Sequence, residues 1–330
     1  MMSQRLNTAL DEGVFAWPDH GPVLLARVSA HLSGAVPVSD CVAAYGFYPE
    51  ARAWREAGVR CEPVMQTGFS AALIALTKTR TFNQRLIAQV VEAVEPGGLI
   101  AVDGAKTDGI DPMARALRSL FDPVDVISKA HGKFAVFRRP VTLPEVISDW
   151  AALKADSPEG WHTDLGGFSA GKIDAGSALL AETLPVLNGA VADLGAGWGY
   201  LARAALAQKA VSRLDLVEAE FATLEMARRN VADPRARFYW ADARDFGDPA
   251  TFDAVIANPP FHQGRASDPG LGLDFIRSAA RLLKAKGTLA LVANRHLPYE
   301  RGLASAFARV TTVAEAKGFK IFHAQGTKRA

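Results

Sequence analysis

Residues 190–200 read Ala190-Val191-Ala192-Asp193-Leu194-Gly195-Ala196-Gly197-Trp198-Gly199-Tyr200. The first five residues form a short apolar segment typical of a buried strand, and the Ala- and Leu-rich segment Tyr200–Lys209 is typical of a helix. Glycines between them let the chain turn tightly and let a ligand approach the backbone without a Cβ in the way. The spacing is Gly-x-Gly-x-Gly, which differs from the Gly-x-Gly-x-x-Gly of dinucleotide sites. Alone, this segment indicates either a structural turn or a cofactor loop.

Strands and helices alternate downstream of this segment. Strands are expected at residues 214–217, 237–240, 252–257 and 288–293, with helices at residues 221–230 and 273–283. This alternation predicts an α/β domain with a doubly wound, mostly parallel sheet. Because ligands of such sheets bind at the carboxyl ends of the strands, the loops after Leu194, Val217, Trp240 and Ala257 should share one rim.

The N-terminal half contains a fainter copy of the same layout. A helix at residues 86–94 and a strand at residues 98–102 match residues 275–283 and 287–291, with Ile87/Ile276, Gly98/Gly287 and Ala101/Ala290 in register. The first half has neither a glycine-rich loop after a strand nor an Asn-Pro-Pro segment. We therefore expect a related fold without the catalytic residues. The join is expected between Pro140 and Gly167, with a linker helix at residues 145–154 and a turn at residues 157–160.

Two acidic residues follow the later strands. Glu218 ends the second strand about 20 residues after the glycine loop, where a carboxylate can accept hydrogen bonds from ribose hydroxyls. Asp242 follows the third strand, where it can accept a hydrogen bond from an adenine amine. A solvated carboxylate is the alternative for Glu218, and near Asp242 the carboxylates of Asp245 or Asp248 could instead cap a helix.

The segment Asn258-Pro259-Pro260-Phe261 follows the fourth strand. Two prolines cannot continue a strand ladder or a helix interior, so they indicate a rigid loop. The Asn258 side-chain oxygen and the Pro259 carbonyl can accept hydrogen bonds from one exocyclic amine, and Phe261 can stack on the ring that bears it. A proline-rich turn with a buried phenylalanine is the alternative, and the ordered glycine loop and Glu218 argue against it.

The composition is that of a globular protein. The chain has 330 residues, 49% of them hydrophobic, and a formal net charge of +2, which by itself does not indicate nucleic-acid binding. Cys41 and Cys61 are too few for a disulfide framework, and no Cys/His cluster has zinc spacing. The sequence has neither an N-terminal signal peptide nor a run of about 18 apolar residues. We expect a cytoplasmic protein with no membrane segment and no metal.

Taken together, Asp193–Gly199, Glu218, Asp242 and Asn258–Phe261 resemble the ordered motifs of class I amino-methyltransferases. Further matching segments are Phe168-Ser169, Asp174–Ser177, Val292–Asn294, Leu297–Tyr299 and Phe319–Phe322. With His262 after the tetrapeptide, they resemble bacterial ribosomal RNA guanine-N2 methyltransferases, best the small-subunit (16S) enzymes of the RsmC type. The resemblance covers the C-terminal half well and the N-terminal half more loosely. Trp198 departs from it, since a small residue is expected there.

The resemblance implies two Rossmann-like methyltransferase domains. Residues 1–154 would form a degenerate copy that supports the fold and positions RNA, and residues 155–330 would form the catalytic domain. It implies S-adenosylmethionine as the cofactor, bound by Asp193, Gly195, Gly197, Gly199, Glu218 and Asp242. It implies a guanine N2 amine of 16S ribosomal RNA as the methyl acceptor, with Asn258, Pro259, Pro260 and Phe261 as the catalytic residues. The expected partner is ribosomal RNA or the assembling small ribosomal subunit, and the expected state is a monomer.

Several alternatives remain open at this point. An NAD-dependent oxidoreductase would explain the glycine loop and Glu218, but not residues 258–261. A non-catalytic RNA-binding protein would not need those residues intact. The same tetrapeptide serves DNA adenine and protein glutamine amines, and a large-subunit ribosomal RNA methyltransferase is the nearest alternative function. His262 could relay a proton, contact RNA or form a structural hydrogen bond. Candidate phosphate contacts are Lys78, Arg80, Lys106, Lys317, Lys320, Lys328 and Arg329.

Overall fold

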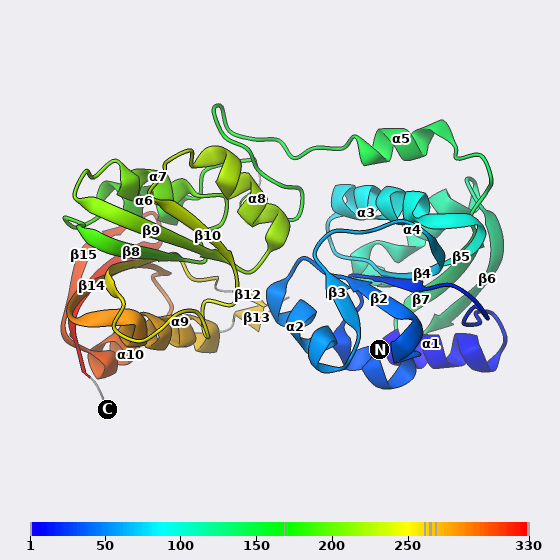
Figure 1. The fold of residues 1–330 in the computed structure, drawn as a ribbon, viewed down its shortest axis with the longest axis horizontal. Coiled ribbons are helices and arrows are strands. Elements are labelled where there is room, and N and C mark those ends of the chain that lie inside the picture. Colours follow the sequence, from blue (N-terminus) through cyan, green and yellow to red (C-terminus); the bar gives the residue numbers. More distant parts are fainter. Residues whose placement is uncertain are drawn as a thin grey trace. The chain divides into compact units, whose positions relative to one another are not determined.

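The computed structural model describes residues 2–167, 169, 171–260, 262–263, 266–267 and 269–328. It divides into two units, Met1–Lys154 and Ala155–Ala330, and each contains a seven-stranded sheet with helices on both faces (Figure 1). The predicted α/β class, with two Rossmann-like domains, is confirmed.

The first unit has the strand order β3-β2-β1-β4-β5-β7-β6. Its strands are β1 (Val23–Ala26), β2 (Cys41–Ala44), β3 (Arg60–Glu62), β4 (Phe69–Ala75), β5 (Val94–Ala105), β6 (Asp122–Lys129) and β7 (Gly132–Arg138). Its α-helices are α1 (Met2–Asp11), α2 (Tyr48–Glu56), α3 (Arg80–Ala93), α4 (Ile110–Arg118) and α5 (Glu145–Ala151), with short 3-10 helices at Ala30–Ala35, Val38–Asp40 and Lys106–Asp108.

The second unit has the strand order β10-β9-β8-β11-β14-β16-β15. Its strands are β8 (Gly189–Leu194), β9 (Val211–Glu218), β10 (Ala236–Trp240), β11 (Phe252–Ala257), β14 (Leu283–Asn294), β15 (Phe307–Ala316) and β16 (Phe319–Thr327). A separate two-stranded ladder joins β12 (His262–Gln263) to β13 (Ala266–Ser267). The helices of the second unit are α6 (Ala175–Glu182), α7 (Tyr200–Leu206), α8 (Phe221–Asn230), α9 (Pro269–Leu282) and α10 (Tyr299–Ala306).

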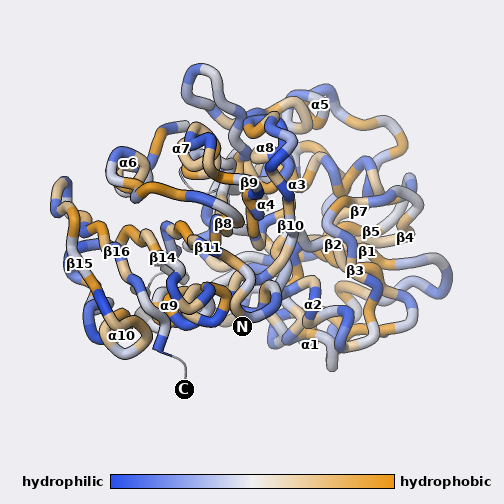
Figure 2. Tube along the Cα trace, turned by 60° about the vertical axis from the view of Figure 1, so that its left-hand side comes forward, coloured by the Kyte–Doolittle hydropathy of each residue, from blue (hydrophilic) through white to orange (hydrophobic). Residues whose placement is uncertain are grey.

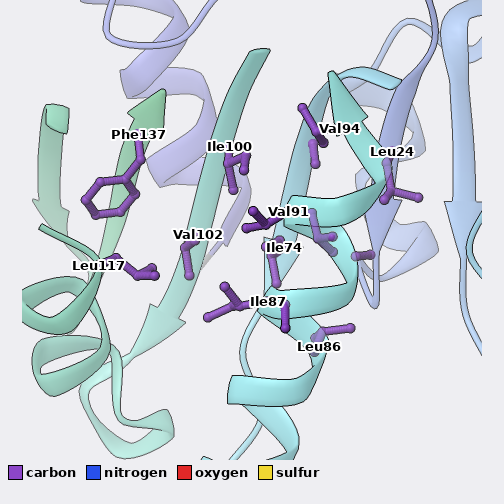
Figure 3. Close-up of a cluster of buried hydrophobic side chains, with 14 of the residues drawn as sticks. Leu24, Ile74, Leu86, Ile87, Val91, Val94, Ile100, Val102, Leu117 and Phe137 are labelled. Carbon is purple, nitrogen blue, oxygen red and sulfur yellow. The ribbon is translucent and has the colours of Figure 1, made fainter. Parts of the chain in front are cut away.

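Apolar periodicity explains the core of the first unit. Leu86, Ile87 and Val91 lie on the face of α3 that packs on the sheet, where Ile74 and Val102 from β4 and β5 meet them (Figure 3). These side chains are at least 95% buried, and burial of each contributes about 1.5–3 kcal/mol relative to exposure. Strands buried on both faces read as continuous apolar runs, which is the expected pattern for a parallel sheet covered by helices.

The second unit has a separate cluster on each face of its sheet. Val191 of β8 packs with Leu201 of α7 and Ala227 of α8 on one face. Leu194 packs with Phe275 of α9 on the other face. Side chains of successive strand residues point to opposite faces, so β8 contributes to both clusters. Figure 2 shows apolar segments along the central strands and hydrophilic residues in the helices and loops around them.

The two sheets share one register as well as one strand order. In each sheet, three adjacent parallel strands are paired so that their final aligned residues stand side by side. The equivalent trios are Ala26, Ala44 and Ile74 in the first sheet, and Leu194, Val217 and Ala257 in the second. The predicted match of Gly98 to Gly287 agrees with this register, because the following residues pair with equivalent positions of β4 and β11. The chain therefore contains a structural duplication.

A buried ion pair fixes the N-terminal helix to the first sheet. The Arg5 guanidinium of α1 donates to both Asp103 carboxylate oxygens, with Nε–Oδ1 and Nη2–Oδ2 distances of 2.6 and 2.7 Å. Arg5 is 3% and Asp103 4% exposed. Burial raises the pKa of Asp103, and the hydrogen bond and charge of Arg5 oppose that shift. Breaking such a pair leaves a buried charge without compensation, so α1 is an integral part of the unit.

Most of the predicted elements are confirmed, with some differences at their ends. The helix at residues 221–230 and the strand at residues 252–257 have the predicted bounds. The helix predicted to reach Lys209 ends at Leu206, and beyond it the Gln208 side chain hydrogen-bonds the backbone of Pro185 and Leu187. The linker helix is present as α5, which ends three residues earlier than predicted.

The far edge of each sheet is antiparallel. β16 pairs antiparallel with β14 and β15, as β7 does with β5 and β6. The mostly parallel sheet predicted for the second unit is thus extended by an antiparallel hairpin. No helix in the described part of the chain is long and apolar enough to cross a membrane. Nor do three metal-ligating side chains gather anywhere among the described residues.

Candidate active site

Four predicted site residues meet at the carboxyl edge of the second sheet. Asp193 is the penultimate residue of β8, Glu218 ends β9, Asp242 lies two residues after β10, and Asn258 directly follows β11. These strands are neighbours in the order β10-β9-β8-β11. Parallel pairing therefore gathers residues that are up to 65 positions apart in sequence onto one rim.

The glycine loop needs its glycines for two different reasons. Gly197 has a φ of +56°, which disfavours a side chain, and a Cβ built there would meet no atom within 4 Å. Its backbone is therefore open to a ligand. Gly199 has a φ of +90°, and a Cβ there would lie 2.7 Å from Val231 Cγ2. Its absence allows α7 to begin close against α8.

Glu218 holds the glycine loop by a direct hydrogen bond. Its Oε2 atom accepts from the Gly197 backbone N–H at 2.9 Å, and its Oε1 atom accepts from the Glu220 N–H at 2.8 Å. Burial raises the pKa of Glu218, and the two backbone donors oppose that shift. A carboxylate oxygen can accept more than one hydrogen bond. Glu218 can therefore shape the loop and still bind a hydroxyl.

Asp193 is a buried carboxylate whose charge is poorly compensated, because the Ala202 backbone N–H only partly opposes the rise in its pKa. It is completely buried, and neither carboxylate oxygen accepts a hydrogen bond of normal geometry from the described residues. Burial and the nearby charge of Glu218 raise the pKa of Asp193 to about 8. A buried, unpaired carboxylate is costly unless it is protonated or meets a positive charge. Two carboxylates with raised pKa values beside a glycine loop make a site suited to a cation.

Asp242 is held by an ion pair with Arg244. The Arg244 backbone N–H and Nε both donate to Asp242 Oδ1 at 2.9 Å, and its Nη2 contacts Oδ2. Asp242 is 9% exposed. Hydrogen bonding from Asp242 to an adenine amine stays a prediction, and in that arrangement the amine and Arg244 would share the carboxylate.

The Asn258 side-chain amide is fixed by two acceptors from α6. Its Nδ2 atom donates to Asp174 Oδ2 at 3.0 Å and to Ser177 Oγ at 2.7 Å. All three residues line one pocket with Gly195 and Gly197. The glycine loop and Asn258 therefore line the same pocket. Pro259 is buried and Pro260 is exposed, whereas Phe261 and the side chain of His262 lie outside the described residues.

Asp174 and Ser177 have no role predicted from the sequence, although both lie in a segment that carries the family resemblance. Asp174 is the N-cap of α6 and accepts from the Ser177 N–H at 2.8 Å. An Asp followed three residues later by a polar residue is a helix-start pattern. That pattern could identify the cap, but not its contact with Asn258.

Trp198, which departs from the family pattern, is explained by its neighbours. Its ring packs edge-on against Trp161, with centroids 4.8 Å apart, and against Tyr200 at 5.7 Å. Its carbonyl accepts from Asn230 Nδ2 at 2.7 Å. The same Asn230 amide accepts from the His162 backbone N–H and donates to the His162 carbonyl. The Trp198 ring therefore packs the segment around residue 161 against the glycine loop. The glycines of the loop still have positive φ angles.

The first unit has other residues at the equivalent positions. Arg27, which follows Ala26, occupies the position equivalent to Gly195. Both residues have a positive φ, and each donates its backbone N–H to a carbonyl of the neighbouring strand. The Arg27 guanidinium lies over the rings of Tyr45 and Phe82, 4.8 and 5.2 Å from their centroids. Tyr45 stands where the second unit has Glu218, and Ala75 where it has Asn258. The first unit thus keeps the scaffold but has neither a carboxylate nor an amide at the positions equivalent to Glu218 and Asn258.

Comparisons with known proteins agree with this arrangement. The methyltransferase small domain family matches residues 160–323. Similar curated proteins include the ribosomal RNA small subunit methyltransferase C of Shewanella oneidensis, 30% identical over 270 residues that cover 79% of this chain and 78% of that protein. The protein of the same name from Shewanella loihica is 29% identical over 307 residues, covering 89% of each chain.

A solved structure is similar over nearly the whole chain. It is the T. thermophilus 16S rRNA N2 G1207 methyltransferase, determined in complex with AdoMet and guanosine. It is 22% identical, with a TM-score of 0.80, and the match covers 98% of this chain and 91% of that one. At this level of identity the likeness supports the fold of both units.

Substitution of Asp193 by Asn should stabilise the unliganded protein at high pH. The pKa of Asp193 in the folded chain, about 8, lies above its ordinary value of 3.8. The stability linked to its proton is therefore complete below about pH 4 and is lost as the pH rises through 8. Asparagine cannot ionise, so Asp193→Asn should melt above the wild type at pH 8.5, with a difference that shrinks toward pH 5.

Thermal melts from pH 5 to 9 measure this effect. The control is Asp253→Asn, which removes a carboxylate that Lys284 contacts at 2.7 Å near the amino end of the same sheet, and it should give no gain. A melting difference for Asp193→Asn that does not change with pH would contradict the assignment.

Proposed function

Because this chain belongs to the ribosomal RNA small subunit methyltransferase C family, it is an S-adenosylmethionine-dependent enzyme that methylates a guanine N2 amine of 16S ribosomal RNA, and we propose which of its residues carry out the transfer. The cofactor is bound by Asp193, Gly195, Gly197, Gly199, Glu218 and Asp242. The target amine is bound by Asn258 and Pro259, Pro260 makes the segment rigid, and Phe261 stacks on the ring that bears the amine. The observation that carries the proposal is that Gly195, Gly197 and Asn258 line the same pocket.

The residues at the glycine loop fit the expected cofactor. S-adenosylmethionine supplies a methyl group on a positively charged sulfur, next to an ammonium group and a ribose. Asp193 offers a buried, poorly compensated carboxylate, which suits a positive charge. Glu218 can accept from ribose hydroxyls with its remaining lone pairs while it holds Gly197. Gly197 leaves the backbone open to close approach.

The acceptor side of the site must orient a weak nucleophile. The lone pair of guanine N2 is delocalised into the ring, so attack requires a pyramidal nitrogen. Asn258 Oδ1 and the Pro259 carbonyl can each accept one N–H of that amine, which directs the lone pair toward the methyl group. Alignment and electrostatics then supply most of the rate enhancement. Methylation acidifies the nitrogen, so its proton can leave without a strong base, and the target base must leave its stack to enter.

The relatives favour one of the alternatives that the sequence left open. Both curated relatives carry the small-subunit name. An oxidoreductase does not account for the amide of Asn258 in the glycine-loop pocket. The DNA, protein and large-subunit substrates have no comparable support among these relatives.

We also propose roles for the two units and for the partner. Residues 155–330 are catalytic, and residues 1–154 support the fold and position RNA. Lys78 and Arg80 follow β4 and Lys106 follows β5, so these exposed side chains lie at the carboxyl edge of the first sheet. The enzyme acts as a monomer on ribosomal RNA or the assembling small subunit. Such RNA is made in the cytoplasm, which supports a cytoplasmic location.

Asn258→Ala should lower kcat by at least about 100-fold while the Kd for S-adenosylmethionine changes by less than about twofold. Asn258 contacts the amine and its effect is felt mainly in the transition state. Methyl transfer to 16S ribosomal RNA and calorimetry measure the two quantities. The matched control is Asn188→Ala, an exposed asparagine before β8 at the opposite edge of the sheet. Wild-type turnover in Asn258→Ala would refute the catalytic assignment.

One S-adenosylmethionine should bind per full-length chain. Glu218→Ala should weaken binding strongly, whereas Tyr45→Ala, at the equivalent position of the first unit, should leave both affinity and stoichiometry unchanged. Calorimetry on the full chain gives both values. A stoichiometry of two, or a loss of binding in Tyr45→Ala, would show that the first unit retains a cofactor site.

The double variant Lys78→Glu/Arg80→Glu should bind 16S ribosomal RNA more weakly. If both side chains contact phosphates, the slope of log affinity against log salt should fall by about 2, with cofactor affinity unchanged. Filter binding over a salt series measures the slope. Lys209→Glu/Lys286→Glu reverses two exposed charges at the amino edge of the second sheet and is the control. Equal slopes in both variants would argue against RNA contacts at the first rim.

A further inference from the structure

The helix start at residues 174–177 does more than begin α6. Asp174 caps the helix by accepting the Ser177 N–H at 2.8 Å. The same Oδ2 atom accepts from Asn258 Nδ2 at 3.0 Å, across 84 residues of sequence. Ser177 Oγ lies 2.7 Å from that nitrogen and accepts its second N–H. One short segment thus accepts both hydrogens of the Asn258 amide.

Close packing places this segment beside Asn258. Gly176 is buried, and a Cβ there would lie 2.9 Å from the Phe319 ring of β16 and 3.1 Å from Asp174 Oδ2. The missing side chain lets the first turn of α6 approach both groups. The acceptor pair is therefore set by the packing of α6 and does not depend on a mobile surface side chain.

The chemistry of the partners determines which way the amide faces. An ionised carboxylate has no hydrogen to donate, so Asp174 can bind only the NH2 end of Asn258. A reversed amide would place its oxygen about 3 Å from the carboxylate, where two partial negative charges repel each other. With both N–H groups engaged, the side-chain oxygen is the part of the amide left for a substrate.

We propose that Asp174, together with Ser177, is a positioning residue that locks the Asn258 amide as a pure acceptor, so that the site selects an exocyclic amine and disfavours a purine that lacks one. The inference rests on the proposed role of Asn258 in amine binding. Without the lock, the amide can rotate by 180° and present a donor, and the fraction of molecules with the correct orientation falls. Loss of orientation reduces both turnover and discrimination.

A specificity measurement tests this lock. Guanosine and inosine differ only by the N2 amine, so the ratio of their Kd values reports on hydrogen bonding to that amine. We expect the wild-type protein, saturated with S-adenosylhomocysteine, to bind guanosine about tenfold more tightly than inosine. Asp174→Ser keeps a good helix cap but has a shorter side chain. It should reduce the ratio to about 2 and lower kcat on 16S ribosomal RNA by at least about tenfold.

Two further variants separate positioning from a purely structural role. Asp174→Asn retains an oxygen that can cap α6 and accept from Asn258, so its ratio and kcat should lie between those of the wild type and Asp174→Ser. In an Asn258→Ala background, Asp174→Ser should cause no further change in the ratio, because its effect acts through the Asn258 amide. Melting temperatures of all variants report any loss of fold.

The outcomes distinguish this inference from the proposed function. A wild-type ratio in Asp174→Ser, or an equal loss in the Asn258→Ala background, would overturn the positioning role while leaving Asn258 in place. A wild-type ratio and turnover in Asn258→Ala would instead overturn the assignment of Asn258 itself. The lock is supported if Asp174→Ser lowers the guanosine/inosine affinity ratio in the wild-type background and has no effect on that ratio in the Asn258→Ala background.

Discussion

Parallel pairing of β8 with β9 and β11 is the constraint on which the site depends. Leu194 stands opposite Val217 on one side and Ala257 on the other. The next residues along the three strands are Gly195, Glu218 and Asn258, so one register brings the glycine loop, the Glu218 carboxylate and the Asn258 amide to the same height. Because strand side chains alternate between faces, a shift of one residue in any strand would send its functional side chain to the other face.

The duplicated unit shows that this register is a scaffold and not in itself a catalytic device. The trio Ala26, Ala44 and Ile74 is paired in the same way and is followed by Arg27, Tyr45 and Ala75. Even the left-handed backbone conformation of Gly195 is present at Arg27. The Arg27 guanidinium lies over two aromatic rings at the position where the second unit has a glycine without a side chain. The scaffold survives because its stability comes from buried strands and helices, whereas the chemistry resides in a few residues at their ends.

The site itself is built from polar groups whose freedom is removed by their neighbours. Burial raises the pKa of both Asp193 and Glu218, and a bound cation would offset the cost of ionising them. Asn258 is restrained in the opposite way, since both of its amide hydrogens already have acceptors. The first arrangement suits a positively charged cofactor, and the second suits a neutral amine that donates hydrogen bonds.

Sequence by itself determined the α/β alternation, the glycine loop and the strand-end residues Glu218 and Asn258, because these features depend on local periodicity and on residues adjacent to a strand. It also indicated the repeat of the fold. It did not reveal the antiparallel hairpin at the sheet edge, the packing of Trp198 on Trp161, or the contact of Asp174 with Asn258. The contacts of Trp198 and Asp174 join segments that are remote in sequence, and the hairpin takes its place in the sheet through the pairing of β16 with β14. Only the packing of helices on the paired strands decides which side chains meet and which way an amide faces.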